Sequence, residues 1–187
     1  RSVINNLMEI SELFNLIQDI FFYYSEIYRQ LMDIVESNLG LQYLIDKLSD
    51  LLGNPITVTD RNFKILAITS AEPKNAELWE KIDQATRHNG YVVGCNETFY
   101  LTKEYVNRLE KCDTLVYFDA SEGYHSSMIC LNIGPQNKKL AILTLFEIDT
   151  PFTDATFDLI DSFSQLLSLE LQKNELLMLN DDSKLAF

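Results

Sequence analysis

The sequence lacks the motifs that mark the common hydrolases, nucleotide-binding proteins and zinc enzymes. It contains no GxSxG, no phosphate-binding P-loop and no HExxH. Its two histidines, His88 and His125, have no close Asp or Cys partners at metal-ligand spacing. The three cysteines include no CxxC pair, so they suggest neither a zinc site nor a disulfide framework and fit a reducing compartment. These absences predict a protein that is not an enzyme and carries no metal or other cofactor.

Basic residues are also scarce. The chain has 15 Lys and Arg against 28 Asp and Glu, a net charge of −13, which repels phosphate backbones and anionic membranes. The most apolar window, Phe21 to Tyr28, is interrupted by charged residues before it reaches the roughly 18 residues of a membrane span. No basic-then-apolar secretion signal is present. We therefore expect a cytoplasmic chain that by itself binds neither nucleic acid nor membrane.

The clearest positive pattern is a heptad repeat near the amino terminus. Apolar residues alternate spacings of four and three at Val3, Leu7, Ile10, Phe14, Ile17, Phe21, Tyr24, Tyr28, Leu31 and Val35. With Leu7 at heptad position a, the g positions are also apolar, at Leu13, Ile20, Ile27 and Ile34. A stripe this wide favours an intermolecular helix bundle. The alternative is a helix that only packs on its own domain.

The rest of the chain alternates helix and strand signals. A second helix is expected over 41–52 and is closed by Gly53. An antiparallel hairpin follows at 55–60 and 63–69, then helical segments at 75–88 and 102–109 around a short strand at 91–93. Three further strands are expected at 114–119, 127–133 and 140–147, and Thr153 is placed to cap a long final helix. This order predicts an α+β fold with a GAF/PAS-like central antiparallel sheet flanked by helices.

Several short stretches resemble the GAF-like amino-terminal sensor domain of PucR-type bacterial transcription regulators. They are GLQYLI at 40–45, LGNPITVTD at 52–60, FKILA at 63–67, LTKEYV at 101–106, PFTD at 151–154 and LELQKN at 169–174. The resemblance covers about residues 40–176 and implies a cytoplasmic domain that binds a small molecule and controls a helix-turn-helix domain.

The limits of the resemblance also suggest where the domain boundaries lie. Residues 1–39 lie outside it and are expected to form a helical dimerisation arm. Residues 40–180 would be the sensor domain, and 181–187 a tail toward an effector domain that this chain does not contain. We expect a homodimer that is held together through helices 1–39 and 153–180.

A sensor needs a cavity with a few polar anchors rather than a reactive constellation. Aromatic and polarizable residues concentrate between positions 79 and 130 and suit a small planar or aromatic ligand. The candidate ligand-binding residues are Trp79, Tyr91, Tyr117, Phe118, His125, Met128 and Cys130. Each of these side chains could instead simply fill the core.

Two alternatives to sensing remain open. Some GAF domains are thiol-dependent reductases, and Cys95 lies in a Gly94-Cys95-Asn96 loop, although no basic residue beside it would lower its pKa. The domain could also be a ligand-free scaffold whose only role is to hold dimers together.

Overall fold

The computed structural model describes residues 2–74, 77, 79–80, 90–92, 103–112, 115–124, 126–135 and 138–184, with side chains placed between residues 10 and 173. The chain divides into two compact units, Arg1–Asn38 and Leu39–Phe187.

The first unit is one helix, α1, from Ser2 to Glu36. It confirms the helix that the heptad pattern predicts. The backbone leaves the helix at Asn38, whose φ of 57° is left-handed, and at Gly40, whose φ is 90°. Asn and Gly adopt this conformation at the lowest cost, so the sequence ends α1 where these residues occur.

The second unit is built on a five-stranded antiparallel sheet. Its strands are β1 (Ile56–Asp60), β2 (Ile65–Ile68), β3 (Leu115–Phe118), β4 (Met128–Ile133) and β5 (Ala141–Phe146). They lie in the order β2-β1-β5-β4-β3. The two hairpins, β1-β2 and β4-β5, therefore meet at the central pair β1-β5, where Val58 is opposite Leu143.

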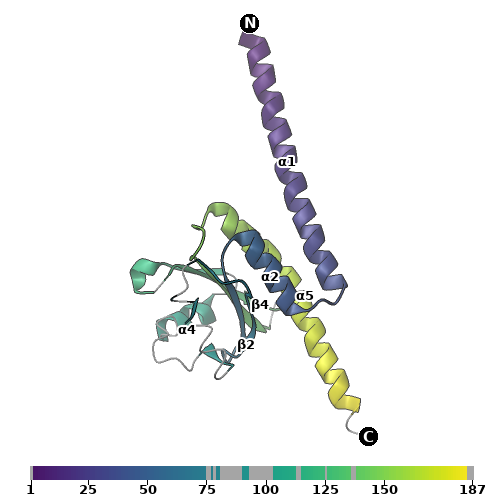
Figure 1. The fold of residues 1–187 in the computed structure, drawn as a ribbon, viewed down its shortest axis with the longest axis vertical. Helices are drawn as coiled ribbons and strands as arrows, with labels where there is room; N and C mark the ends of the chain where they lie inside the picture. The colour runs from purple at the N-terminus through teal and green to yellow at the C-terminus, as the bar shows by residue number, and fades with distance from the viewer. Residues whose placement is uncertain are drawn as a thin grey trace. The chain divides into compact units, whose positions relative to one another are not determined.

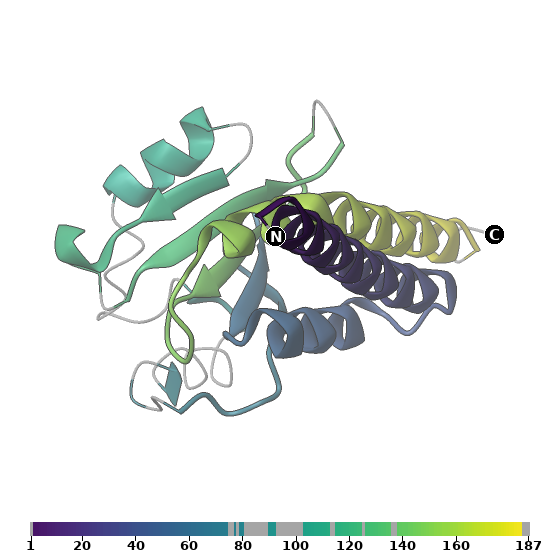
Figure 2. The ribbon, with the colours of Figure 1, turned by 90° about the horizontal axis from the view of Figure 1, so that it is seen from above.

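Two helices cover one face of this sheet. Helix α2 (Leu41–Leu52) contacts β1 and β2, and α5 (Asp154–Lys184) contacts β4 and α2. Figures 1 and 2 show them on the same side of the sheet. Alternate strand residues such as Val58, Leu143 and Leu145 are fully buried, as expected for a sheet face that packs on helices.

The connection between β2 and β3 joins the two edge strands of the sheet. Its described residues Trp79, Val92, Tyr105 and Leu109 are buried together with residues of β3, β4 and β5. This connection carries α4 (Lys103–Lys111), which contacts β4 and lies on the side away from α2 and α5 (Figure 2). A long segment laid over a sheet face is a common place for a ligand site.

The structure confirms the predicted fold class: an α+β architecture with a central antiparallel sheet and long first and last helices. The helix expected at 75–88 and the strand expected at 91–93 lie mostly outside the described residues, although Tyr91 forms an isolated antiparallel bridge with Lys64. Among the helices described, none combines the length and apolar character that a membrane crossing requires.

Candidate functional site

A buried apolar cluster lies on the sheet face that carries α4. It consists of Trp79, Val92, Tyr105, Leu109, Val116, Phe118, Met128, Cys130, Ile142 and Phe146. The aromatic rings contact one another: Tyr105 and Phe118 have centroids 4.8 Å apart, and Trp79 meets Phe146 edge to face at 6.2 Å. We call this set the α4-side cluster.

Polar side chains form a row on the same sheet face, and Cys130 belongs to both the row and the cluster. In the strand register Thr57 is opposite Thr144, Thr144 is opposite Cys130, and Cys130 is opposite Val116. Directly paired residues of antiparallel strands project from the same face, so Thr57 and Thr144 face the same side as Cys130. The row crosses the three central strands β1, β5 and β4.

Cys130 and Thr144 have hydrogen-bond partners, whereas Thr57 at the other end of the row has none among the described residues. The Tyr105 hydroxyl lies 3.4 Å from Cys130 Sγ, which lies 3.7 Å from Thr144 Oγ1. Thr57 is only 3% exposed, and its Oγ1 has no hydrogen-bond partner within the described part of the chain. An unpaired buried hydroxyl costs about 1–3 kcal/mol. The Thr57 hydroxyl is therefore an unmet polar group on the α4 side.

The Cys130 thiol is held in its neutral form. Burial raises its pKa to about 11, and the hydrogen bonds with Tyr105 and Thr144 offset that effect only in part. Because the thiolate is the reactive species, Cys130 is a weak donor or acceptor in the row rather than a nucleophile at neutral pH.

Arg108 of α4 borders the α4-side cluster. Its guanidinium lies 4.2 Å from the centroid of the Phe118 ring, a cation–π distance. The same side chain donates to the carbonyl oxygen of Tyr117 and to the Glu122 carboxylate, each at 2.5 Å. Glu122 lies in the short 3-10 helix η3 (Ala120–Glu122), where it forms a capping box with Asp119. The charge of Arg108 is thus already engaged with protein groups.

The structure brings together four of the seven predicted ligand-binding residues. Trp79, Phe118, Met128 and Cys130 all belong to the α4-side cluster. The ring of Tyr117 instead contacts Phe152 and Phe157, with centroids at 6.5 and 5.7 Å, beside the start of α5. Tyr91 is 42% exposed and is not a member of the cluster. His125 lies outside the described residues.

Sequence reasoning missed Thr57, Thr144 and Tyr105. Thr57 and Thr59 alternate with apolar residues in β1, a pattern usually read as a strand with one solvated face. In the structure Thr57 is buried, and its face of the sheet also carries the α4-side cluster. The signal that could have found it is the length of the β2–β3 connection, which is far longer than a hairpin turn.

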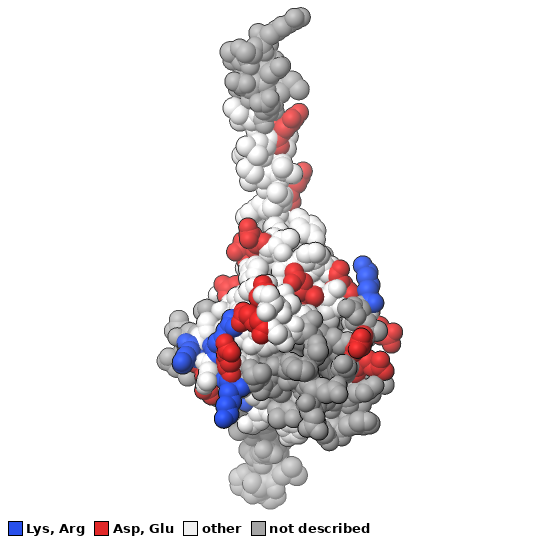
Figure 3. All heavy atoms as spheres, turned by 90° about the vertical axis from the view of Figure 1, so that its left-hand side faces the viewer, with Lys and Arg blue, Asp and Glu red and all other residues white. Residues whose placement is uncertain are grey.

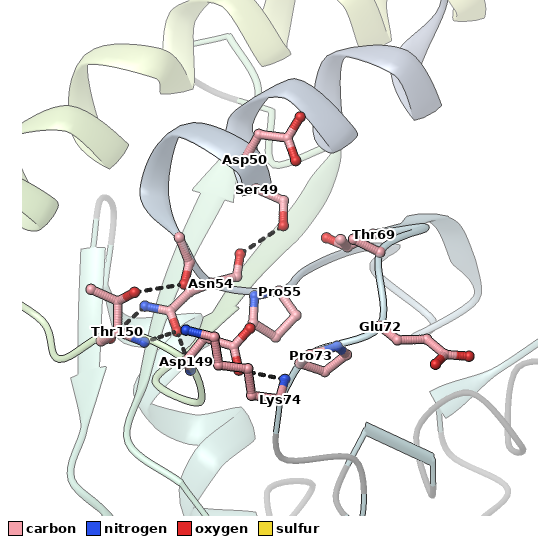
Figure 4. Close-up of a pocket in the computed structure, with 12 residues that line it drawn as sticks. Ser49, Asp50, Asn54, Pro55, Thr69, Glu72, Pro73, Lys74, Asp149 and Thr150 are labelled. Atoms are coloured by element: carbon pink, nitrogen blue, oxygen red, sulfur yellow. Dashed lines mark hydrogen bonds between the residues drawn. The ribbon is translucent and has the colours of Figure 1, made fainter.

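A second candidate is a surface pocket where α2 joins β1, with a volume of about 270 Å³ (Figure 4). Polar side chains line much of it, but several already bond to protein groups. Ser49 Oγ donates to the Asn54 carbonyl at 2.8 Å, and the Asp149 carboxylate accepts from the Lys74 amide at 2.7 Å. The Thr150 hydroxyl donates to the Gly53 carbonyl at 3.0 Å.

Asn54 is the centre of this joint. Its Oδ1 accepts from the amides of Ile148, Asp149 and Thr150 at 3.0, 2.9 and 3.2 Å, and its Nδ2 donates to the Thr150 carbonyl at 2.6 Å. Figure 4 shows Asn54 reaching across to Thr150 and Asp149. Since its polar groups are occupied, we interpret this pocket as a structural joint between α2, β1 and the turn that leads to α5.

Potential metal ligands do not gather in the described residues: no group of three or more His, Cys, Asp or Glu side chains there could hold an ion.

Comparisons with known proteins give a distant likeness only. No family model matches the sequence, and no curated protein matches it. One similar solved structure is the cofactor-binding GAF domain of the nutrient sensor CodY from Clostridium difficile. It is 15% identical, covers 78% of this chain and 97% of its own, and superposes with a TM-score of 0.47. That neighbour is a GAF domain, whereas the assignment to PucR-type regulators remains a prediction.

Proposed function

We propose that residues 40–180 form a ligand-sensing domain that binds a small molecule between the sheet and the β2–β3 connection. The observation that carries the proposal is the buried hydroxyl of Thr57, which has no partner among the described residues and lies on the sheet face that carries the α4-side cluster. Apolar walls with a few unmet polar groups are the usual composition of a small-molecule site. Thr57 would supply the polar anchor, and Trp79, Phe118 and Met128 the apolar contacts.

The joint at Asn54 supports a route from this site to the helices. Thr57 lies three residues after Asn54, whose side chain holds the turn at 148–150 that precedes α5. Helix α2 ends at Leu52 and is separated from Asn54 only by its cap, Gly53. A shift of β1 on ligand binding would therefore move the end of α2 and the start of α5 together. The helices would pass this change to an effector domain that controls transcription.

Thermal unfolding against a panel of purines, amino acids and aromatic acids tests the proposal. A binder at about a hundred times its dissociation constant raises the free energy of unfolding by about 2.7 kcal/mol. Thr57→Val removes the hydroxyl and keeps the shape. We expect it to leave the ligand-free protein as stable or slightly more stable, because an unsatisfied buried group disappears, and to remove most of the ligand response.

Thr144→Val is the matched control, because the Thr144 hydroxyl has a partner in Cys130. It should lower the stability of the ligand-free protein rather than raise it. A panel without any binder, or a Thr57→Val variant that keeps the full ligand response, would contradict the proposal and favour the ligand-free scaffold.

The thiol-dependent reductase is a weaker candidate. Cys130 does not favour it, because burial keeps its thiol neutral at physiological pH. The other candidate nucleophile, Cys95, lies outside the described residues. An alkylation assay at neutral pH tests this alternative, since a reactive Cys95 is its minimum requirement.

A further inference from the structure

Helix α1 exposes a long apolar surface. Between residues 10 and 28 its exposed positions include Ile10 (62% exposed), Phe14 (59%) and Phe21 (68%). Leu13, Ile17, Ile20 and Tyr28 are also exposed, and all seven occupy heptad positions a, d or g. Exposed apolar surface of this extent is rare on isolated domains and usually marks an interaction site. We call it the a/d/g stripe.

Four acidic residues of α1 form a row on the opposite side. Glu12, Asp19, Glu26 and Asp33 recur every seven residues, all at position f. In a helix with 3.5 residues per turn, f lies about 150° from the middle of the a/d/g stripe. Figure 3 shows carboxylates along the described part of α1, separated by uncharged surface.

Positions e and g of α1 carry no charge. Between residues 11 and 34, positions e hold Ser11, Gln18, Ser25 and Met32, and positions g hold only Leu or Ile. On the other flank of the stripe, position c holds one charged residue, Glu9. A partner of opposite charge would find no carboxylate at e or g to pair with, although these positions normally select coiled-coil partners. An identical helix, in contrast, can dock here without bringing two carboxylates together, because both acidic rows point outward.

The same pattern disfavours a membrane as the occupant. Helices that lie on membrane surfaces carry Lys and Arg on their polar face. The polar face of α1 is acidic, and Arg29 is paired with Glu26 and Asp33 at 2.7 and 2.8 Å.

We propose that the a/d/g stripe of α1 packs against the same stripe of a second copy of this chain, so that α1 is a homotypic assembly element. This contact lies within the first unit, so it does not depend on ligand binding by the second. The a/d/g face of α1 is covered in the assembly, and the f face stays in solvent.

Two adjacent phenylalanines provide a matched test. Phe21 at position a is 68% exposed and Phe22 at position b is 66% exposed, so the two side chains are nearly equally exposed in a single chain. Only Phe21 lies in the stripe. We compare Phe21→Lys with Phe22→Lys in the full chain by sedimentation equilibrium, with far-UV circular dichroism to verify that both variants keep their helix content.

The unaltered chain should be a dimer or a larger closed oligomer. Phe21→Lys should weaken association by at least about 30-fold, because it buries a charge at the centre of the contact, whereas Phe22→Lys should change it by less than about 3-fold. Equal effects of the two variants would overturn the proposal, as would a monomer at every concentration. A monomer that floats with phosphatidylglycerol vesicles would assign the stripe to a membrane instead.

Discussion

At the scale of single residues, Asn54 shows how one side chain can join distant parts of the chain. It is 3% exposed and makes four hydrogen bonds to the backbone of residues 148–150, nearly a hundred positions away. Gly53 before it has a φ of 64°, and an added Cβ would lie 2.7 Å from Thr150 Oγ1. The GNP sequence is therefore both the end of α2 and the clamp on the turn that starts α5.

Replacing Asn54 tests this clamp. Asn54→Ala leaves the amides of Asp149 and Thr150 without an acceptor, whereas the Ile148 amide keeps the Phe146 carbonyl. We therefore expect a loss of about 2–4 kcal/mol in the free energy of unfolding. Asn54→Asp keeps an acceptor but places a carboxylate oxygen against the Thr150 carbonyl and buries a charge, so we expect it to be destabilising as well. Urea denaturation measures both.

Asn62→Ala is the control for Asn54, because Asn62 is exposed in the β1–β2 turn. Its cost should stay within about 0.5 kcal/mol, as is usual for surface substitutions. If Asn54→Ala were as mild as Asn62→Ala, the hydrogen bonds of Asn54 would not hold the two segments together.

At the scale of helices and strands, local sequence predicted most elements because each carries its own periodicity and stop signals. The heptad repeat predicted α1, and the Gly53 cap predicted the end of α2.

The residues of the candidate site were harder to predict from the sequence. Tyr117 and Phe118 are neighbours in β3, and successive strand residues face opposite sides, so only one of them could join the α4-side cluster. The row from Thr57 to Cys130 depends on pairing between distant strands, which no local pattern reports.

Helix α4 gives a prediction at this scale. The last carbonyl groups of α4 have no hydrogen-bond donor within the helix. Side chains from outside α4 donate to these carbonyls instead. Asn132 Nδ2 donates to Leu109 O and Cys112 O at 3.0 and 2.9 Å, and Lys139 Nζ donates to Cys112 O at 2.7 Å. Lys139→Met removes the ammonium and keeps the aliphatic stem. We expect a loss of about 1 kcal/mol in urea denaturation.

The control for Lys139 is Lys103→Met. Lys103 is exposed at the amino-terminal end of α4, where a positive charge opposes the helix dipole. Its removal should be neutral or slightly stabilising. Equal losses from both substitutions would mean that Lys139 acts through general charge rather than by capping α4.

At the scale of the whole molecule, the net charge of −13 acts against any assembly of identical copies. Charge repulsion between copies extends over about 30 Å at 0.01 M salt but only about 8 Å at 0.15 M. The a/d/g stripe contains no charged residue, so salt has no ion pair to weaken there. The two effects predict the same direction: self-association through α1 should strengthen as salt is added.

Sedimentation equilibrium at 0.01 M and 0.15 M sodium chloride measures this dependence. We expect the association constant to rise by about 3- to 30-fold at the higher salt, since repulsion is screened while the apolar contact persists. Asp19→Asn removes one carboxylate from the outward f row, so it should tighten association at low salt and reduce the salt effect. Association that weakens with added salt would instead indicate a contact built from ion pairs. Such a contact cannot be the uncharged a/d/g stripe, so the interface would have to lie elsewhere on the molecule.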